Sequence, residues 1–336
     1  MFMIYLSIII PVFNEENFIV NTLLALINQD YPKDRFEIIV VDGNSTDDTR
    51  TVVEQFITAH FDFLICMLDN PHRLSSAARN IGIRNAKGHL IAVIDAHVYI
   101  PTNKLFKNME RLKEKNTALC LARPAPLDIP GLIRGKSMWI AVARKCWLGH
   151  SLNSSIYSNF EGFVDPTSSG FAYDKSIFNQ VGYFDESFDA AEDVEFHFRL
   201  KMNGIMAYTS PDLLIYSYPR ESFSALFKQQ VRYGEGRAKF IKKHPRGFTI
   251  ETLFPALICV CFLSLPLTLL CGWHLTFWRI FHVSIISLYS AAILITGLRE
   301  ALIRKRFFPG IVVALAVWVT HVGLGWGFIK TILRFK

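Results

Sequence analysis

The sequence predicts an α/β domain with a doubly wound, mostly parallel sheet, followed by a C-terminal region of about three membrane helices. Over the first 125 residues, β-branched apolar runs alternate with amphipathic stretches, a pattern typical of strand–helix units that build a parallel sheet. The chain is mixed and charged up to His244 and dominated by apolar runs from Leu253 onward. We therefore expect two domains, residues 1–245 and residues 246–336.

The expected elements of the first domain follow in chain order. Strands are predicted at 7–12, 37–41, 63–68, 90–94 and 118–121. Helices are predicted at 15–28, after a capping box at Ser45–Asp48, at 75–86 and at 102–115. Beyond Arg123 we expect helices at 132–147, 192–202 and 222–243, and a polar loop at 153–170.

Three runs in the second domain are long enough to cross a bilayer, at about 253–273, 280–298 and 311–329. None of them contains Asp, Glu, Lys or Arg. Proline and glycine within such runs are tolerated when neighbouring groups satisfy the freed backbone. The alternative interpretation is a buried helical layer of a soluble protein.

Basic residues predict the orientation of these spans. Lys242, Lys243 and Arg246 precede the first run, and a loop with Arg299, Arg304, Lys305 and Arg306 follows the second, so both should face the cytoplasm. The basic tail (Lys330, Arg334, Lys336) conflicts, because three spans would place it outside. Either the third segment is re-entrant, or the larger charge of the loop decides the orientation and the tail lies outside. The N-terminus lacks signal-peptide features, so we expect a multi-pass cell-membrane protein whose first 240 residues are cytoplasmic.

Charge and cysteine content narrow the class of partner. The formal net charge is +7, and much of the excess lies near the apolar runs, which suits anionic headgroups and a diphosphate-bearing lipid. No compact basic motif with interleaved aromatic residues is present, so we expect no nucleic-acid partner. The six cysteines lack paired metal spacing, which fits reduced thiols in a cytosolic protein.

Polar residues fall at the ends of three predicted strands. Asn14 and Glu15 follow the first strand, Asp42 ends the second and Asp95 ends the fourth. Ligands of open parallel sheets bind beyond the carboxyl ends of the strands, where a carboxylate can accept hydrogen bonds from a ribose or a base edge. For any one of these residues a helix cap or a turn is the alternative.

The triplet Asp95-Ala-His97 could hold a divalent cation, since carboxylate and imidazole together suit Mn²⁺ at least as well as Mg²⁺. Such a cation neutralises the charge of a departing diphosphate. An Asp-x-His spacing is also frequent by chance.

Two further groups could carry chemistry. Glu192 and Asp193 begin a predicted helix, where the dipole favours acidic residues, but one of them could also be a general base. Arg232 on the basic helix could pair with diphosphate oxygens and Tyr233 could stack on a sugar, or the basic residues could be interfacial snorkelling groups.

Several motifs, in this order, resemble the inverting family 2 glycosyltransferases over about residues 5–245. They are Ser7–Glu16, Val41–Thr49, Ala78–Gly82, Asp95–His97, Gly182–Glu186, Glu192–Asp193 and Gln229–Tyr233. The Asp-Gly-x-Ser-Thr-Asp run, the Asp-Ala-His triplet and the trailing membrane helices most resemble the succinoglycan-glucosyltransferase-like subgroup.

This resemblance implies a GT-A fold and a nucleotide-sugar donor, commonly a UDP-sugar. It places Pro11, Asn14, Glu15 and Asp42 in the nucleotide pocket, Arg79 near the diphosphate, and Asp95 and His97 at the Asp-x-Asp position of the metal and donor. It makes Asp193, beside Glu192, the general base. Gln229 and Arg232 match a Gln-x-x-Arg-Trp element that would contact the acceptor or the diphosphate, with Tyr233 in place of Trp.

We therefore expect a membrane-anchored inverting glycosyltransferase that uses Mn²⁺ or Mg²⁺. It would move a sugar from a UDP-sugar to a lipid-linked acceptor, such as a polyprenyl-linked sugar, in cell-surface polysaccharide biosynthesis. Two alternatives remain open: a small processive polysaccharide synthase, and a non-catalytic membrane scaffold that binds a glycan.

Overall fold

The computed structural model describes residues 5–150, 156–270, 276–305 and 307–334. The chain forms two compact units, Met1–Ile129 with Ser154–Tyr218, and Pro130–Asn153 with Pro219–Lys336. The expected boundary at residue 245 lies elsewhere, because the segment before it packs with the apolar helices rather than with the sheet.

The first unit contains an eight-stranded sheet in the order β3-β2-β1-β4-β8-β6-β9-β7 within the described residues. Its strands are β1 Leu6–Val12, β2 Phe36–Asp42, β3 Ile65–Asp69, β4 Leu90–Val93, β6 Cys120–Ala122, β7 Gly162–Val164, β8 Gly170–Asp174 and β9 Ala207–Thr209. Strands β3, β2, β1 and β4 run parallel, whereas β8 is antiparallel to both β4 and β6. Strands β5 (Val98–Tyr99) and β10 (Tyr216–Ser217) form a separate antiparallel pair.

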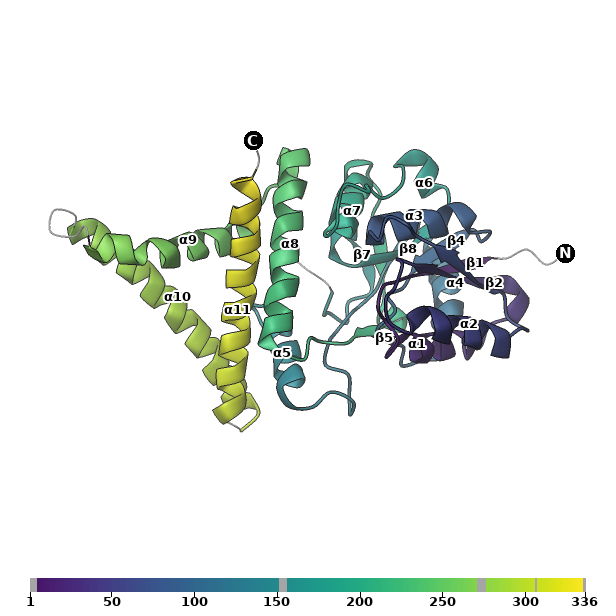
Figure 1. The fold of residues 1–336 in the computed structure, drawn as a ribbon, viewed down its shortest axis with the longest axis horizontal. Helices are drawn as coiled ribbons and strands as arrows, with labels where there is room; N and C mark the ends of the chain where they lie inside the picture. Colours follow the sequence, from purple (N-terminus) through teal and green to yellow (C-terminus); the bar gives the residue numbers. More distant parts are fainter. Residues whose placement is uncertain (1–4, 151–155, 271–275, 306, 335–336) are drawn as a thin grey trace. The chain divides into compact units, whose positions relative to one another are not determined.

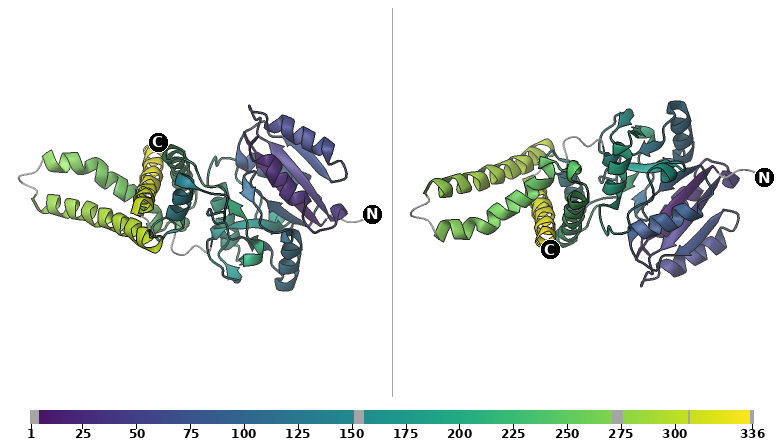
Figure 2. Two further views of the ribbon diagram at one scale, coloured as in Figure 1. Left: turned by 90° about the horizontal axis from the view of Figure 1, so that it is seen from below. Right: turned by 90° about the horizontal axis from the view of Figure 1, so that it is seen from above.

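Helices cover both faces of the sheet (Figures 1 and 2). They are α1 Ile19–Ile27, α2 Thr49–Ala59, α3 Ser75–Asn85, α4 Leu105–Asn116, α6 Ile177–Gln180 and α7 Glu192–Met202, with short 3₁₀ helices at Lys33–Arg35, Pro166–Ser168 and Pro211–Leu213. Side chains of a strand alternate between faces. Ile8 and Ile10 join one buried core with α1, whereas Ile9 joins a second core with α3 and α7. The two cores confirm the doubly wound architecture.

Several local predictions failed. The segment predicted as a loop contains β7 and the 3₁₀ helix at Pro166–Ser168 (residues 153–155 lie outside the described residues), and β8 and β9 were not predicted. The capping box at Ser45–Asp48 is wrong, because the N-cap of α2 is Asp48 and its side chain makes no cap hydrogen bond. Ser45 instead donates its hydroxyl proton to Asp42 Oδ1 at 2.6 Å.

The second unit is helical. Its elements are α5 Gly135–Lys145, α8 Phe223–Lys243, a 3₁₀ helix at Pro245–Gly247, α9 Ile250–Leu270, α10 Thr276–Ile303 and α11 Phe307–Ile332. Helices α9, α10 and α11 are each long and apolar enough to cross a membrane. One buried cluster joins α5 and α8 with these three helices.

Candidate active site

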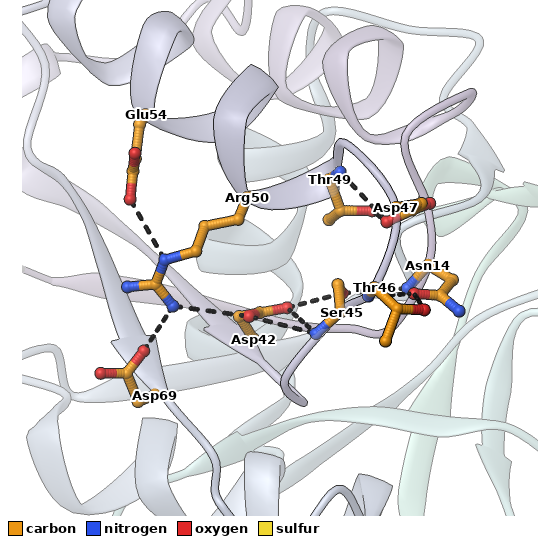
Figure 3. Close-up of polar contacts among 9 residues, drawn as sticks. All are labelled: Asn14, Asp42, Ser45, Thr46, Asp47, Thr49, Arg50, Glu54 and Asp69. Atoms are coloured by element: carbon orange, nitrogen blue, oxygen red, sulfur yellow. Dashed lines mark hydrogen bonds and ion pairs between the residues drawn. The ribbon is translucent and has the colours of Figure 1, made fainter.

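The loops after β1 and β2 are bonded to each other (Figure 3). Asn14 has a left-handed backbone (φ 57°), which asparagine tolerates better than most residues. Its Oδ1 accepts a hydrogen bond from the Thr46 amide at 2.8 Å, and its own amide donates to Ser45 Oγ at 3.0 Å. Asn14 therefore fixes the shape of the edge where these strands end.

Asp42 lies at the end of β2 and is 2% exposed. One carboxylate oxygen accepts from the Ser45 hydroxyl, and the other lies 3.5 Å from Arg50 Nη1 (Figure 3). The same guanidinium donates to Asp69 at 2.6 Å and to Glu54 at 3.2 Å. The Asp42 carboxylate is thus held from two sides.

Pro11 occupies the next-to-last position of β1, paired with Val41. The pairing of β1 with β4 stops earlier, at Ile9 and Val93, so β1 extends beyond its neighbour at this edge. A proline is tolerated where no ladder hydrogen bond needs its missing N–H.

Asp95 lies just after β4, between two guanidinium groups. Arg79 Nη2 is 4.0 Å from Asp95 Oδ1, and Arg123 Nη2 is 3.9 Å from Asp95 Oδ2. Burial alone would raise the pKa of Asp95, but the positive charges of Arg79, His97 and Arg123 outweigh it and hold that pKa below its usual range. Asp95 is therefore a carboxylate at neutral pH.

Arg79 joins the β4 edge to the beginning of α7. Its Nη2 lies 3.3 Å from Glu192 Oε1, and its Nε donates to Ser75 Oγ at 3.3 Å. Burial raises the pKa of Glu192, and the Asp193 charge adds to that effect, while Arg79 opposes both. Glu192 is thus a buried partner of Arg79.

Helix α3 also fixes the loop that leads into α7. Asn80 accepts from the Phe184 amide and donates to the Phe184 carbonyl, both at 2.9 Å. Ser76 donates to the Phe188 carbonyl at 3.1 Å. The loop ends at Ala191, whose φ of 62° is unusual for alanine and places Glu192 and Asp193 in the first turn of α7. Backbone strain of this kind is frequent at functional sites.

A buried imidazole lies one helical turn beyond Asp193. His197 Nε2 is 2.7 Å from the Tyr173 hydroxyl, which also donates to the Gly170 carbonyl at 3.1 Å. Burial lowers the pKa of His197 to about 4, although the Asp193 charge opposes this shift. His197 is therefore neutral at physiological pH.

The Glu15 side chain contacts His97, and its part in the nucleotide pocket remains a prediction. Its Oε1 lies 2.8 Å from His97 Nδ1, and its backbone amide donates to Thr49 Oγ1 at 2.7 Å. A carboxylate that holds one ring nitrogen fixes the tautomer and orientation of an imidazole, as in many metal sites.

Asp95 and His97 supply only part of the ligands that a divalent cation needs. Asp95 offers carboxylate oxygens and His97 an imidazole that Glu15 orients, a combination that suits Mn²⁺. Within the described part of the chain, no group of three His, Cys, Asp or Glu side chains could hold a metal ion. Donor oxygens of a substrate would complete such a site.

Gln229, Arg232 and Tyr233 lie on α8 and so belong to the helical unit. In the amide orientation that its surroundings favour, Gln229 Oε1 accepts from Arg220 Nε at 3.2 Å and from the Tyr233 hydroxyl at 3.3 Å. Their part in the acceptor or diphosphate site remains a prediction.

Sequence reasoning missed three residues of this region: Arg123, Tyr173 and His197. Arg123 comes two residues after the strand predicted at 118–121, at the edge that carries Asp95, and this position could have revealed it. The spacing of His197, four residues after Asp193, places both on one face of a helix. Tyr173 lies in β8, which was not predicted, so no signal pointed to it.

The chain is similar to known families over most of its length. The family model described as glycosyl transferase family 2 matches residues 7–182, and the one described as glycosyl transferase family group 2 matches residues 139–330.

Two curated relatives match almost end to end. The dolichyl N-acetyl-α-D-glucosaminyl phosphate 3-β-D-2,3-diacetamido-2,3-dideoxy-β-D-glucuronosyltransferase of Methanococcus voltae is 31% identical over 337 residues, covering 98% of both chains. The succinoglycan biosynthesis protein ExoA of Rhizobium meliloti is 28% identical, covering 98% of this chain and 95% of its own.

Among solved structures, the mannosyltransferase PcManGT of Pyrobaculum calidifontis, in complex with GDP-Man and Mn²⁺, superposes with a TM-score of 0.65. It is 19% identical, and the match covers all of this chain and 89% of that one. This likeness supports the GT-A fold.

Proposed function

Since this chain belongs to glycosyl transferase family 2 and is a glycosyltransferase of glycan biosynthesis, we propose that it transfers a sugar with inversion from a UDP-sugar to a lipid-linked acceptor. The observation that carries this proposal is the position of Arg79. It lies between Asp95 at the β4 edge and Glu192 at the start of α7, and thereby joins the donor side of the site to the helix that carries Asp193.

In this mechanism Asp193 removes the proton of the acceptor hydroxyl as that oxygen attacks the anomeric carbon. One carboxylate acts as base rather than nucleophile, so no covalent sugar–enzyme intermediate forms and the anomeric configuration inverts. Glu192, which is paired with Arg79, holds that guanidinium in place and is the less suitable base.

The leaving diphosphate requires positive charge on the donor side. Arg79 and Arg123 flank Asp95 and can donate hydrogen bonds to phosphate oxygens. A divalent cation held by Asp95 and His97 would add charge neutralisation there. The solved neighbour that contains Mn²⁺ and GDP-Man supports the choice of Mn²⁺.

The nucleotide would contact the edge formed by Pro11, Asn14 and Asp42, where the buried Asp42 carboxylate is held ready to accept a base or ribose N–H or O–H. The Methanococcus voltae relative is named for transfer to a sugar carried by dolichyl phosphate. This name supports a polyprenyl- or dolichyl-linked acceptor for the present chain. The apolar helices support transfer at a membrane. The basic residues that flank them support a cytoplasmic sheet domain, by the positive-inside rule.

The test is a screen of radiolabelled UDP- and GDP-sugars against membranes that contain the full-length chain, with Mn²⁺ and a lipid extract. We expect one UDP-sugar to label a lipid by a single sugar addition. Label from GDP-sugars alone would contradict the donor assignment, long polymer would favour the processive synthase, and no transfer from any donor would favour the glycan-binding scaffold.

The base is tested separately. Asp193→Asn should lower turnover by roughly 10²–10⁴-fold, because general-base catalysis contributes about that much. Asp62→Asn is the matched control, since Asp62 pairs with Lys33 on the surface. A folded Asp193→Asn enzyme with wild-type turnover would remove Asp193 from the mechanism.

A further inference from the structure

Helices α8 and α11 run side by side and in the same direction (Figure 1). Gly323 of α11 approaches Phe227 and Gln230, and Gly327 approaches Val231 so closely that a Cβ there would lie 2.1 Å from the Val231 carbonyl oxygen. Further along both helices, Lys330 Nζ forms a 2.7 Å ion pair with Glu235. The last two turns or so of α11 therefore lie at the same level as residues 227–235 of α8.

That part of α8 is too charged for the hydrocarbon core of a bilayer. Lys228 and Arg232 are exposed, and Glu235, Arg237 and Lys239 follow within two turns. A charged side chain at the bilayer centre costs at least about 2.5–3.5 kcal/mol. Helix α8 must therefore stay in the interface or outside it, and the part of α11 that packs along it stays there as well.

The first half of α11 is held by α5, which is also amphipathic. Ile140 and Ala143 of α5 share a buried cluster with Val313 and Val317 of α11. Just beyond α5, the Leu148 carbonyl lies 2.9 Å from His321 Nε2. Helix α5 carries Lys136, Arg144 and Lys145, so it must also stay out of the hydrocarbon core.

Burial within the protein accounts for the apolar composition of α11. Of its most apolar 18 residues 61% are buried, against 17% for α9 and 22% for α10. A helix that is apolar all round is either a membrane span or a buried core helix. The large exposed side chains of α11 fall mainly on one stripe, which contains Ile311, Leu315, Trp318 and Trp326. One apolar stripe with tryptophan is typical of a helix that lies in the membrane interface.

We propose that this chain crosses the bilayer only twice, through α9 and α10, and that α5, α8 and α11 lie together in the membrane interface. The C-terminal tail then lies on the same side as the sheet domain and the loop after α10. All the basic segments at Lys242–Arg246, Arg299–Lys305 and Lys330–Arg334 share that side, as the positive-inside rule requires. With two crossings, the basic tail no longer lies on the outer side, where three spans would place it.

Two epitope tags on the otherwise unaltered full-length chain test this topology. One tag precedes Met1 and the other follows Lys336, and sealed inside-out and right-side-out vesicles are treated with protease. We expect both tags to be digested in one vesicle population and both to be protected in the other. A C-terminal tag that is protected where the N-terminal tag is digested would overturn the proposal.

Two controls make each outcome decisive. Detergent must render both tags digestible, which shows that protection comes from the membrane. The chain must also stay in the membrane after an alkaline carbonate wash, because a chain without crossings would place both tags together as well. Release of the chain by the wash would contradict the two crossings through α9 and α10. Neither readout depends on sugar transfer, so the topology can fail while the proposed function stands.

Discussion

The Glu15 carboxylate lies 2.8 Å from Nδ1 of His97, although the two residues are 82 positions apart in the chain. His97 stands where the resemblance places the second acidic residue of an Asp-x-Asp pair. This contact therefore gives the imidazole the carboxylate partner that a metal-binding histidine ordinarily has.

The main effect of replacing Glu15 should be weaker binding of the divalent cation. We expect Glu15→Ala to reduce the affinity for Mn²⁺ about 10- to 100-fold, because the imidazole loses the group that orients it. Mn²⁺ binding is measured by electron paramagnetic resonance in the presence of UDP. Glu16→Gln is the matched control, because its amide can still accept the hydrogen bond from the Asp48 amide. Equal Mn²⁺ affinity in the Glu15 variant and the wild type would contradict the role of Glu15 in orienting a metal-binding His97.

Removing Arg79 should cost stability as well as turnover. Arg79→Met leaves Glu192 buried without its 3.3 Å partner, a loss of about 3–5 kcal/mol in buried pairs. In the double variant Arg79→Met, Glu192→Gln we expect much of the free energy of unfolding to return while turnover stays low. Thermal unfolding and transfer assays on the same preparations separate these effects. Recovery of turnover in the double variant would mean that Arg79 only neutralises Glu192.

Arg50 should affect nucleotide binding through Asp42. Arg50→Gln removes the contact at 3.5 Å and the bridge to Asp69, so the Asp42 carboxylate is less well fixed. We expect the inhibition constant of free UDP to rise about three- to tenfold, or about 0.7–1.4 kcal/mol, with little change in kcat. Arg84→Gln, an exposed arginine on α3, is the control. A fall in kcat at an unchanged inhibition constant would contradict this role.

His197 should make the sheet domain sensitive to mild acid. Its pKa in the folded protein is about 4, below the value of about 6.5 for an unfolded chain, so the unfolded state binds the proton first. Stability should therefore fall as the pH drops from about 6.5 to about 4, by about 3 kcal/mol in total. Urea unfolding at several pH values measures this. In His197→Gln, whose amide can still bond the Tyr173 hydroxyl, the pH-dependent loss should be smaller; an identical loss in both proteins would assign it to other groups.

The sequence predicted the parallel half of the sheet well, because β1, β2 and β4 are buried on both faces and read as continuous apolar runs. It failed for β8 and β9. β8 begins with glycine and ends with aspartate, and β9 has only three residues, so neither carries a recognisable pattern of its own. Their pairing depends on neighbours that are distant in the chain.

For the candidate site, the sequence identified side chains at strand ends but not their partners. The pairing of Glu15 with His97 and that of Arg79 with Glu192 join segments 82 and 113 residues apart. No local pattern records such contacts. Arg123 carries no such pattern, because it opens a proline-rich stretch that resembles a plain loop.

Helix α3 carries Arg79 on one side and, through Asn80 and Ser76, anchors the loop before α7 on another. The guanidinium assigned to the departing phosphate and the carboxylate assigned to the incoming hydroxyl thus share one rigid support. A displacement of α3 on donor binding would shift both ends of the reaction axis together, so their separation can stay constant through a catalytic cycle.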